Sequence, residues 1–240
     1  MILKNYDRKL IPELPKLVRT NIGGRRHYDT PSGSYPSITS VLDIRNKEGI
    51  LAWRKRVGNE EANRISKRAT TRGTHFHSLL EKYFLNEIND YDSFSGDALA
   101  RNPGVWFLFL EAVQILEKKV GDIYCIEDYL YSDEYKVAGA VDMIAEYEGK
   151  TSVVDFKTSN SDKKEEWIEN YFIQGTAYAK MFTERTNIPC DQLVIFIMPD
   201  SGVPQIFIKS VDDYTPLLIS AIEDFKKYQQ KTWLLSFLIV

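Results

Sequence analysis

Apolar positions recur at helical spacing through the first half of the chain, after a short N-terminal hairpin. Residues 17–29 carry a Gly-Gly pair at the predicted turn, and 30–36 contain two prolines and a glycine, which predicts a loop. The predicted helices run from Ser37 or Thr39 to about residue 44, over 47–57, over 59–86 with a break near Gly73, and over 104–119, with a polar connection at 87–104.

The second half of the chain has shorter apolar runs bounded by turn residues. The predicted strands cover 122–131, 137–147, 151–158, 192–199 and 203–209, and the predicted helices cover 163–186 and 213–231. This order predicts a mixed α/β fold, with a central mixed sheet flanked by helices. At 240 residues the chain is expected to form one elaborated domain.

The segment 139–158 places charged residues on two apolar strands joined by a Glu-Gly-Lys turn. Side chains two positions apart share a face of a strand, so Asp155 and Lys157 are expected to point the same way, with Asp142 brought alongside by the hairpin. Converging carboxylates favour a hard divalent cation, and they should raise the pKa of Lys157. The alternative interpretation is a hairpin with exposed charges.

Three further positions are weaker candidates. Glu127 lies on the preceding strand, but its alternate neighbours Cys125 and Tyr129 make its face partly apolar, and a surface Glu is nearly as good an interpretation. His77 and Glu81 share one helix face, where the histidine could bind a metal and the glutamate could hold its ring. An isolated helical histidine is more often not a ligand.

Gln174 and Tyr178 also lie four residues apart, on the helix that follows the lysine strand. Their amide and ring could contact a nucleotide. On the residues alone, an ordinary amphipathic helix is the better explanation of the pair.

Charge is distributed unevenly along the chain. The net charge is −3, but residues 1–72 carry 16 Lys and Arg against 7 Asp and Glu, a local balance of +9. Such asymmetry indicates a polyanion-binding segment, with a basic solvated helix as the plain alternative. Two cysteines exclude a disulfide framework and a cysteine-ligated iron–sulfur cluster.

Nothing in the sequence predicts a membrane segment or a secretory signal, and the final eight residues, 233–240, are expected to be a buried strand or helix end. The expected location is the cytoplasm of a bacterium or of a phage-infected host. Residues 1–72 are interpreted as a basic elaboration of the same domain, and residues 73–240 as its core.

Five motifs in order resemble the PD-(D/E)xK nuclease superfamily, in its RecB-like exonuclease branch. They are Gly73-Thr74…His77…Glu81, Glu127, Gly139…Asp142, Asp155-Phe156-Lys157-Thr158 and Gln174…Tyr178. The upstream segment, with Pro36-Ser37 and Leu51…Trp53, is similar to the mitochondrial genome maintenance exonucleases and related phage nucleases.

The resemblance implies a restriction-endonuclease-like core and a DNA exonuclease that uses one or two Mg²⁺ or Mn²⁺ ions and favours single-stranded ends. By matching position, the implied metal ligands are His77, Asp142, Asp155, the backbone carbonyl of Phe156 and Glu127, and Lys157 is the implied catalytic lysine. Gln174 and Tyr178 become substrate-side or orienting residues, and Glu81 lies behind His77.

The resemblance also gives the basic segment a role. Arg54, Arg56, Arg68 and Arg72 are expected to guide a single DNA strand toward the metals, and Trp53 is either a stacking platform or a core residue. Two other functions stay open: a structure-specific endonuclease or flap nuclease, and a non-catalytic DNA-binding module with a nuclease fold.

Overall fold

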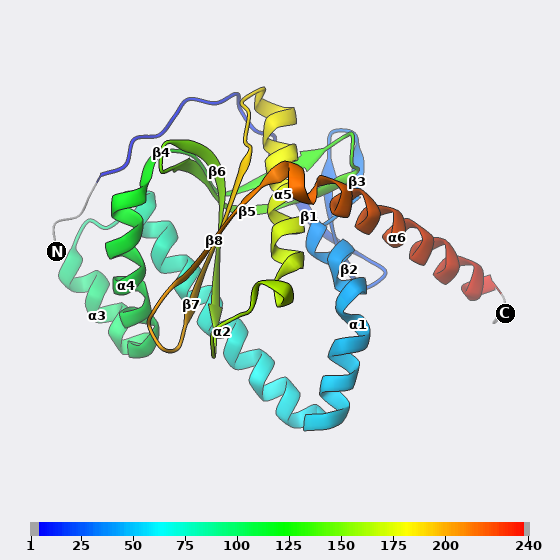
Figure 1. Cartoon of the computed structure of the whole chain (residues 1–240), viewed down its shortest axis with the longest axis horizontal. Helices are drawn as coiled ribbons and strands as arrows, with labels where there is room; N and C mark the ends of the chain where they lie inside the picture. The colour runs from blue at the N-terminus through cyan, green and yellow to red at the C-terminus, as the bar shows by residue number, and fades with distance from the viewer. Residues whose placement is uncertain (1–4, 238–240) are drawn as a thin grey trace.

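The computed structural model describes residues 5–237, and its N-terminal part is a small antiparallel sheet followed by two long helices (Figure 1). The elements of this part are β1 (Val18–Ile22), β2 (Arg25–Thr30), β3 (Gly33–Pro36), α1 (Ile38–Val57) and α2 (Asn59–Phe84). The predicted loop at 30–36 is wrong in part, because Gly33–Pro36 pairs with β2 and Thr30 Oγ1 donates a 2.7 Å hydrogen bond to the carbonyl oxygen of Gly33.

Both long helices continue where the sequence pattern predicted a stop or a break. Ser37 caps α1 as expected, with its hydroxyl accepting from the Ser40 N–H at 3.1 Å, but the helix runs on through residue 44 because 45–48 contain no breaker. In α2 no break occurs near Gly73, because the flanking residues Arg72, His75 and Phe76 are buried against the core.

The predicted polar connection at 87–104 contains a helix and the start of another. They are α3 (Tyr91–Arg101) and α4 (Pro103–Lys119). Asp90 caps α3, and Asn102 Oδ1 accepts from the Val105 N–H at 3.2 Å at the start of α4, directly before a proline in the first turn. These capping signals are visible in the sequence.

The second half of the chain forms a five-stranded sheet in the order β4-β5-β6-β7-β8, which confirms the predicted mixed sheet flanked by helices. All neighbours are antiparallel except β6 and β7, which are parallel and joined by a helical crossover. The elements are β4 (Val120–Ser132), β5 (Val137–Tyr147), β6 (Lys150–Ser159), the short helix η1 (Glu165–Trp167), α5 (Glu169–Thr186), β7 (Gln192–Pro199), β8 (Gln205–Ser210) and α6 (Val211–Phe237).

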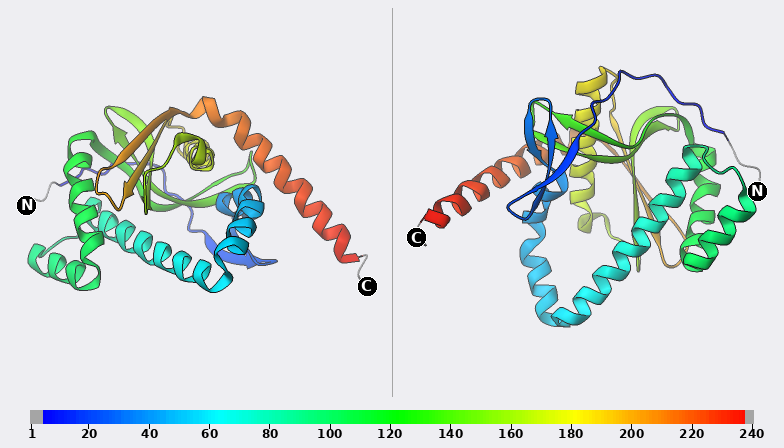
Figure 2. Two further views of the ribbon diagram at one scale, coloured as in Figure 1. Left: turned by 60° about the horizontal axis from the view of Figure 1, so that its bottom comes forward. Right: turned by 180° about the vertical axis from the view of Figure 1, so that it is seen from behind.

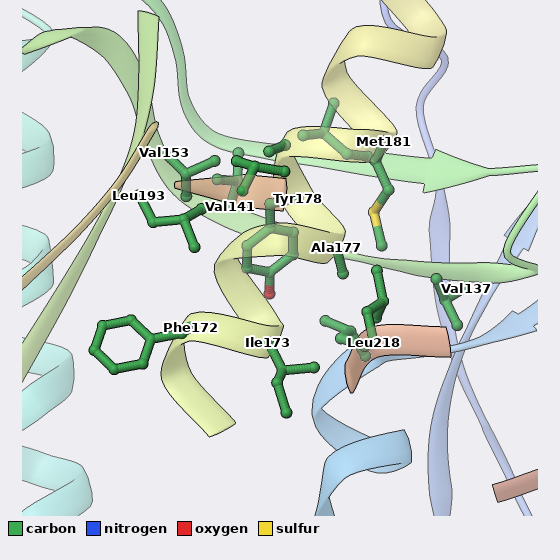
Figure 3. Close-up of a cluster of buried hydrophobic side chains, with 14 of the residues drawn as sticks. Val137, Val141, Val153, Phe172, Ile173, Ala177, Tyr178, Met181, Leu193 and Leu218 are labelled. Carbon is green, nitrogen blue, oxygen red and sulfur yellow. The ribbon is translucent and has the colours of Figure 1, made fainter. Parts of the chain in front are cut away.

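Each face of this sheet is covered by helices (Figures 1 and 2). Residues of α1, α5 and α6 pack on one face, and Figure 3 shows α5 laid against Val141, Val153 and Leu193 of the strands. Residues of α2, α3 and α4 pack on the other. The single helix expected over 163–186 is wrong in its first part, where the structure has the short helix η1 and then, after Ile168, the separate helix α5.

Two further sequence expectations concern the chain ends and membranes. The side chains of 233–240 lie outside the described residues, although α6 extends to Phe237. Within residues 5–237, no helix is both long enough and apolar enough to cross a membrane.

Candidate metal centre

Strands β5 and β6 part at the position of Asp142. Their backbone pairing runs from Tyr147↔Lys150 to Met143↔Val154 and goes no further. Beyond it, Asp142 Oδ2 accepts a 2.8 Å hydrogen bond from the backbone N–H of Phe156. The carboxylate therefore replaces a bond of the strand ladder, and this fixes it in the seam between the two strands.

Asp155 and Lys157 lie on the same face of β6, as strand alternation predicted, and they form an ion pair. Asp155 is buried and Lys157 is 22% exposed. Burial lowers the pKa of Lys157, but Asp155 and Asp142 outweigh it, so the pKa is raised, as predicted. Burial raises the pKa of Asp155 to about 6, although Lys157 opposes this rise.

His77 reaches this seam from α2 and lies between three groups. Its Nε2 is 2.8 Å from the carbonyl oxygen of Phe156, and its Nδ1 is 3.5 Å from Asp142 Oδ1 and 3.7 Å from Glu127 Oε1. Burial lowers the pKa of His77, but Asp142 and Glu127 more than compensate and raise it to about 9. One imidazole thus touches a carbonyl and two carboxylates that were all predicted as ligands.

These groups fit a hard divalent cation. His77, Glu127 and Asp142 each offer one ligand atom, and the three atoms lie within 4.8 Å of one another. Imidazole nitrogen and carboxylate oxygen are donors that suit Mn²⁺, and the oxygens suit Mg²⁺. We refer to these three residues, with Asp155, Phe156 and Lys157, as the candidate centre. Asp155 is set apart within it, because its carboxylate contacts Lys157.

The backbone conformation at Glu127 explains why strand alternation did not predict the face on which its side chain lies. Its φ of +50° lies in the left-handed region, which is uncommon for a residue other than glycine. The register on both sides, Ile126↔Met143 and Asp128↔Val141, places Glu127 opposite Asp142. The local change of direction turns Glu127 toward His77, although Cys125 two positions earlier lies in the core under α5.

Gln174 and Tyr178 contact each other and the strand that carries Asp142. Gln174 Nε2 donates to the Tyr178 hydroxyl at 3.1 Å, and Tyr178 is buried, which raises the pKa of its phenol. A Cβ at Gly139 would lie 2.7 Å from Tyr178 Cε1, so only glycine fits there. Tyr178 is therefore packed against β5, and of the pair only Gln174 is partly exposed.

Tyr171 is a neighbour of the centre that sequence reasoning missed. Lys157 Nζ lies 5.3 Å from the centre of its ring, and burial raises the pKa of its phenol. Its spacing of three from Gln174 and seven from Tyr178 is the signal that could have identified it, because all three share one face of α5.

Glu81 lines the same depression as His77, of about 430 Å³, together with Glu127. Within the described residues no hydrogen bond joins Glu81 to His77, whose ring is held by the Phe156 carbonyl instead. No direct contact between Glu81 and His77 therefore supports the predicted role of Glu81 in orienting the ring.

The four predicted DNA-guiding arginines occupy different environments. Arg72 is buried, and its guanidinium binds Thr158, Asn160 and Asp200, the last at 2.6 Å, so it ties α2 to the end of β6. Arg68 is exposed and lines a depression of about 540 Å³ beside the start of α4. Arg54 is half-buried and donates to Asn63 Oδ1, whereas Arg56 is exposed at the end of α1.

Comparison with profiles of protein families finds no match to this chain. The chain is 26% identical over 180 residues to human mitochondrial genome maintenance exonuclease 1, which covers 67% of the chain and 48% of the relative. It is 23% identical over 157 residues to the mouse protein of the same name, covering 58% of the chain and 44% of the relative. The chain thus spans about half the length of the curated relatives it matches.

A solved structure from Eubacterium rectale, with a provisional assignment as an exonuclease, is also similar. It matches with a TM-score of 0.42 and 18% identity, over 63% of this chain and 64% of that chain.

Proposed function

We propose that this chain is a metal-dependent nuclease that hydrolyses phosphodiester bonds of DNA from single-stranded ends. One observation carries the proposal: an imidazole, two carboxylates and a lysine, from four separate elements, converge where β5 and β6 part. The similarity to proteins named mitochondrial genome maintenance exonuclease 1 supports the same chemistry and a DNA substrate. The order of the motifs supports a PD-(D/E)xK core.

We assign His77, Glu127 and Asp142 as the residues that hold a divalent cation, Mg²⁺ or Mn²⁺. The Phe156 carbonyl is close enough to His77 to join them once the imidazole turns from it. Asp155 Oδ2 is buried, and its ion pair with Lys157 connects the lysine to this group of residues. A bound cation lowers the pKa of a water and neutralises charge on the phosphoryl group.

Lys157 is the group that acts on the reacting atoms in this proposal. Its ammonium is held by Asp155 and by the ring of Tyr171, so it needs little reorganisation during the reaction. A fixed positive charge placed there can orient the attacking water or stabilise the negative charge that develops on phosphorus oxygens. Gln174 and Tyr178 contribute indirectly, because they hold β5 and therefore Asp142.

The exposed cations of α2 support a polyanionic substrate. Arg64, Lys67 and Arg68 line the depression beside α4, about two and a half to three and a half turns before His77 on the same helix.

A time course on end-labelled DNA tests the proposal. Single-stranded and double-stranded oligonucleotides are incubated with Mg²⁺ or Mn²⁺, with and without EDTA, and the products are separated by size. We expect the single strand to be shortened only in the samples that contain Mg²⁺ or Mn²⁺ without EDTA. Absence of cutting under all conditions would contradict the proposal, and cutting of circular single-stranded DNA would replace the exonuclease assignment with an endonuclease.

A further inference from the structure

A second concentration of positive charge lies on the outer side of α1, facing the β1–β2 hairpin. The depression there has a volume of about 900 Å³. We call it the hairpin–α1 groove, and its charged lining residues are Arg19, Arg25, Arg26, Lys47, Arg54 and Asp43. Five cations therefore face a single carboxylate, in a chain whose net charge is −3.

The cations of the groove are available to a ligand. No ion pair within 4.0 Å joins any of the five to a carboxylate among the described residues, whereas other cations such as Lys9 and Arg185 are paired. Aromatic rings hold two of them instead: the Arg25 guanidinium lies 4.7 Å from the Tyr228 ring centre, and Lys47 Nζ donates to the Tyr228 hydroxyl at 3.3 Å. A ring fixes the position of a cation and leaves its charge in place.

The turn of the hairpin adds an open backbone to this surface. Gly23 and Gly24 both have positive φ, +59° and +78°, as a tight two-residue hairpin turn requires. No atom lies within 4 Å of where a Cβ would stand at either glycine. A phosphate can therefore approach this turn without meeting a side chain.

The groove is separate from the candidate centre. The other side of α1 contacts the start of α5, through Arg45 to Glu169 at 2.7 Å and Asn170 to Asn46 at 3.0 Å. Helix α5 in turn carries Tyr171 against Lys157. Figure 1 shows α5 beside α1 and α6, whereas the N-terminal sheet packs directly on the end of β4 and β5, where Tyr28 and Tyr35 contact Tyr131 and Ala138. A ligand in the groove would therefore lie across α1 from the reacting atoms.

We propose that the hairpin–α1 groove is a second nucleic-acid-binding surface, which holds the sugar–phosphate backbone of the substrate away from the candidate centre. Repeated phosphates match a row of unpaired cations, and the exposed Ile50 and Leu51 on the same lining offer apolar contact to bases. This inference rests on the proposed function, because it takes the polyanion to be the substrate of the same chain. Its consequence is that long strands bind more tightly than short ones.

The test compares two charge-reversed variants of the full chain. The groove variant is Arg19→Glu with Lys47→Glu, and the control variant is Lys118→Glu with Lys150→Glu, which makes the same change in net charge at exposed positions outside the groove. Thermal unfolding checks that both remain folded. Binding of labelled single-stranded DNA of 8 and 40 nucleotides is measured in EDTA over a series of salt concentrations, and cutting of the 8-mer is measured with Mn²⁺.

For the groove variant we expect about a tenfold loss of affinity for the 40-mer, and a salt slope lower by about 0.7 for each phosphate contact removed. Affinity for the 8-mer and its rate of cutting should stay as in the wild type. Unchanged 40-mer affinity, or an equal loss in the control variant, would overturn the proposal. So would a loss of binding to poly-glutamate without any loss of DNA binding, which would indicate an acidic protein partner.

The outcomes also separate this inference from the proposed function. If the wild type cuts the 8-mer and the groove variant keeps its affinity for the 40-mer, only the groove assignment fails. If the wild type cuts no DNA but the groove variant binds the 40-mer more weakly than the wild type does, the nuclease assignment fails and the binding surface stands.

Discussion

The candidate centre and the hairpin–α1 groove both contain clustered charged side chains, but they differ in whether the cations are buried and paired. In the centre, Lys157 is mostly buried and is paired with a buried Asp155. In the groove, Lys47 and Arg19 are exposed and have no carboxylate partner among the described residues. The buried cation is restricted to one position, whereas the exposed ones can adjust to a mobile polymer.

The difference teaches what each charge can contribute. A charge that is fixed and partly desolvated acts strongly over a short distance, which suits a reaction step. Exposed charges are screened by salt and contribute mainly to association. This division of roles can be tested by substitutions in each region.

Removing the lysine of the centre should abolish cutting and spare binding. We expect Lys157→Ala to lower the rate by at least about 100-fold, because a preorganised group aimed at developing charge is lost. The assay is single-turnover cutting of a labelled single strand, with affinity measured in EDTA. Lys164→Ala is the matched control, since its side chain is 66% exposed, and full activity in Lys157→Ala would refute the site assignment.

Adding the cation should stabilise the wild type. A ligand at about 100 times its Kd contributes about 2.7 kcal/mol to the free energy of unfolding, so Mn²⁺ should raise the Tm and EDTA should reverse the rise. Asp142→Asn should lose most of this shift. Asp97→Asn, an exposed acid on α3, should keep it. An equal shift in Asp142→Asn would place the cation elsewhere.

The contact behind Asp142 can be broken without touching a charge. In Gly139→Ala the new methyl would overlap the Tyr178 ring, and overpacking of this kind lowers the free energy of unfolding by about 1–3 kcal/mol. Urea denaturation measures it, and activity should fall as β5 shifts. Gly96→Ala on α3 is the control: nothing lies within 4 Å of its Cβ, so it should be neutral or stabilising by up to about 1 kcal/mol.

Two arginines four residues apart on α2 should behave differently. Arg72→Ala removes a buried guanidinium with three partners and should destabilise the protein by about 1–3 kcal/mol. Arg68→Ala should change stability by less than about 0.5 kcal/mol and lower the salt slope of DNA binding by about 0.7. Denaturant unfolding and DNA-binding titrations on both variants measure these effects. Identical behaviour of the two variants would contradict the assignment of Arg72 to stability and of Arg68 to DNA binding.

Much of the centre could be predicted because it depends on local periodicity. The shared face of Asp155 and Lys157 follows from a spacing of two in a strand, and the raised pKa of Lys157 follows from the acids beside it. The sheet and its flanking helices follow from the same patterns.

The remaining features depend on contacts between distant segments. The direction of Glu127 results from one left-handed backbone angle, and the burial of Arg72 results from Asp200, which is 128 positions away. Strand β3 exists because β2 offers a pairing edge, and the propensity of a segment with two prolines does not reveal that edge. The caps at Asp90 and Asn102 and the spacing of Tyr171 from Gln174 and Tyr178 are sequence signals that could have been used.

The parallel pairing of β6 with β7 sets a lower limit on any excised fragment. Every residue of the candidate centre precedes Thr186, yet β6 receives β7 along the whole of Ser152–Ser159. A chain ending after α5 would keep every residue of the candidate centre but would expose β6, an apolar strand, with its backbone N–H and C=O groups unpaired along that edge. Such an edge pairs readily with other copies, so we expect this fragment to aggregate. We therefore expect the smallest fragment that folds to include β7, which contributes no residue of the candidate centre, together with β8 to cover the new edge.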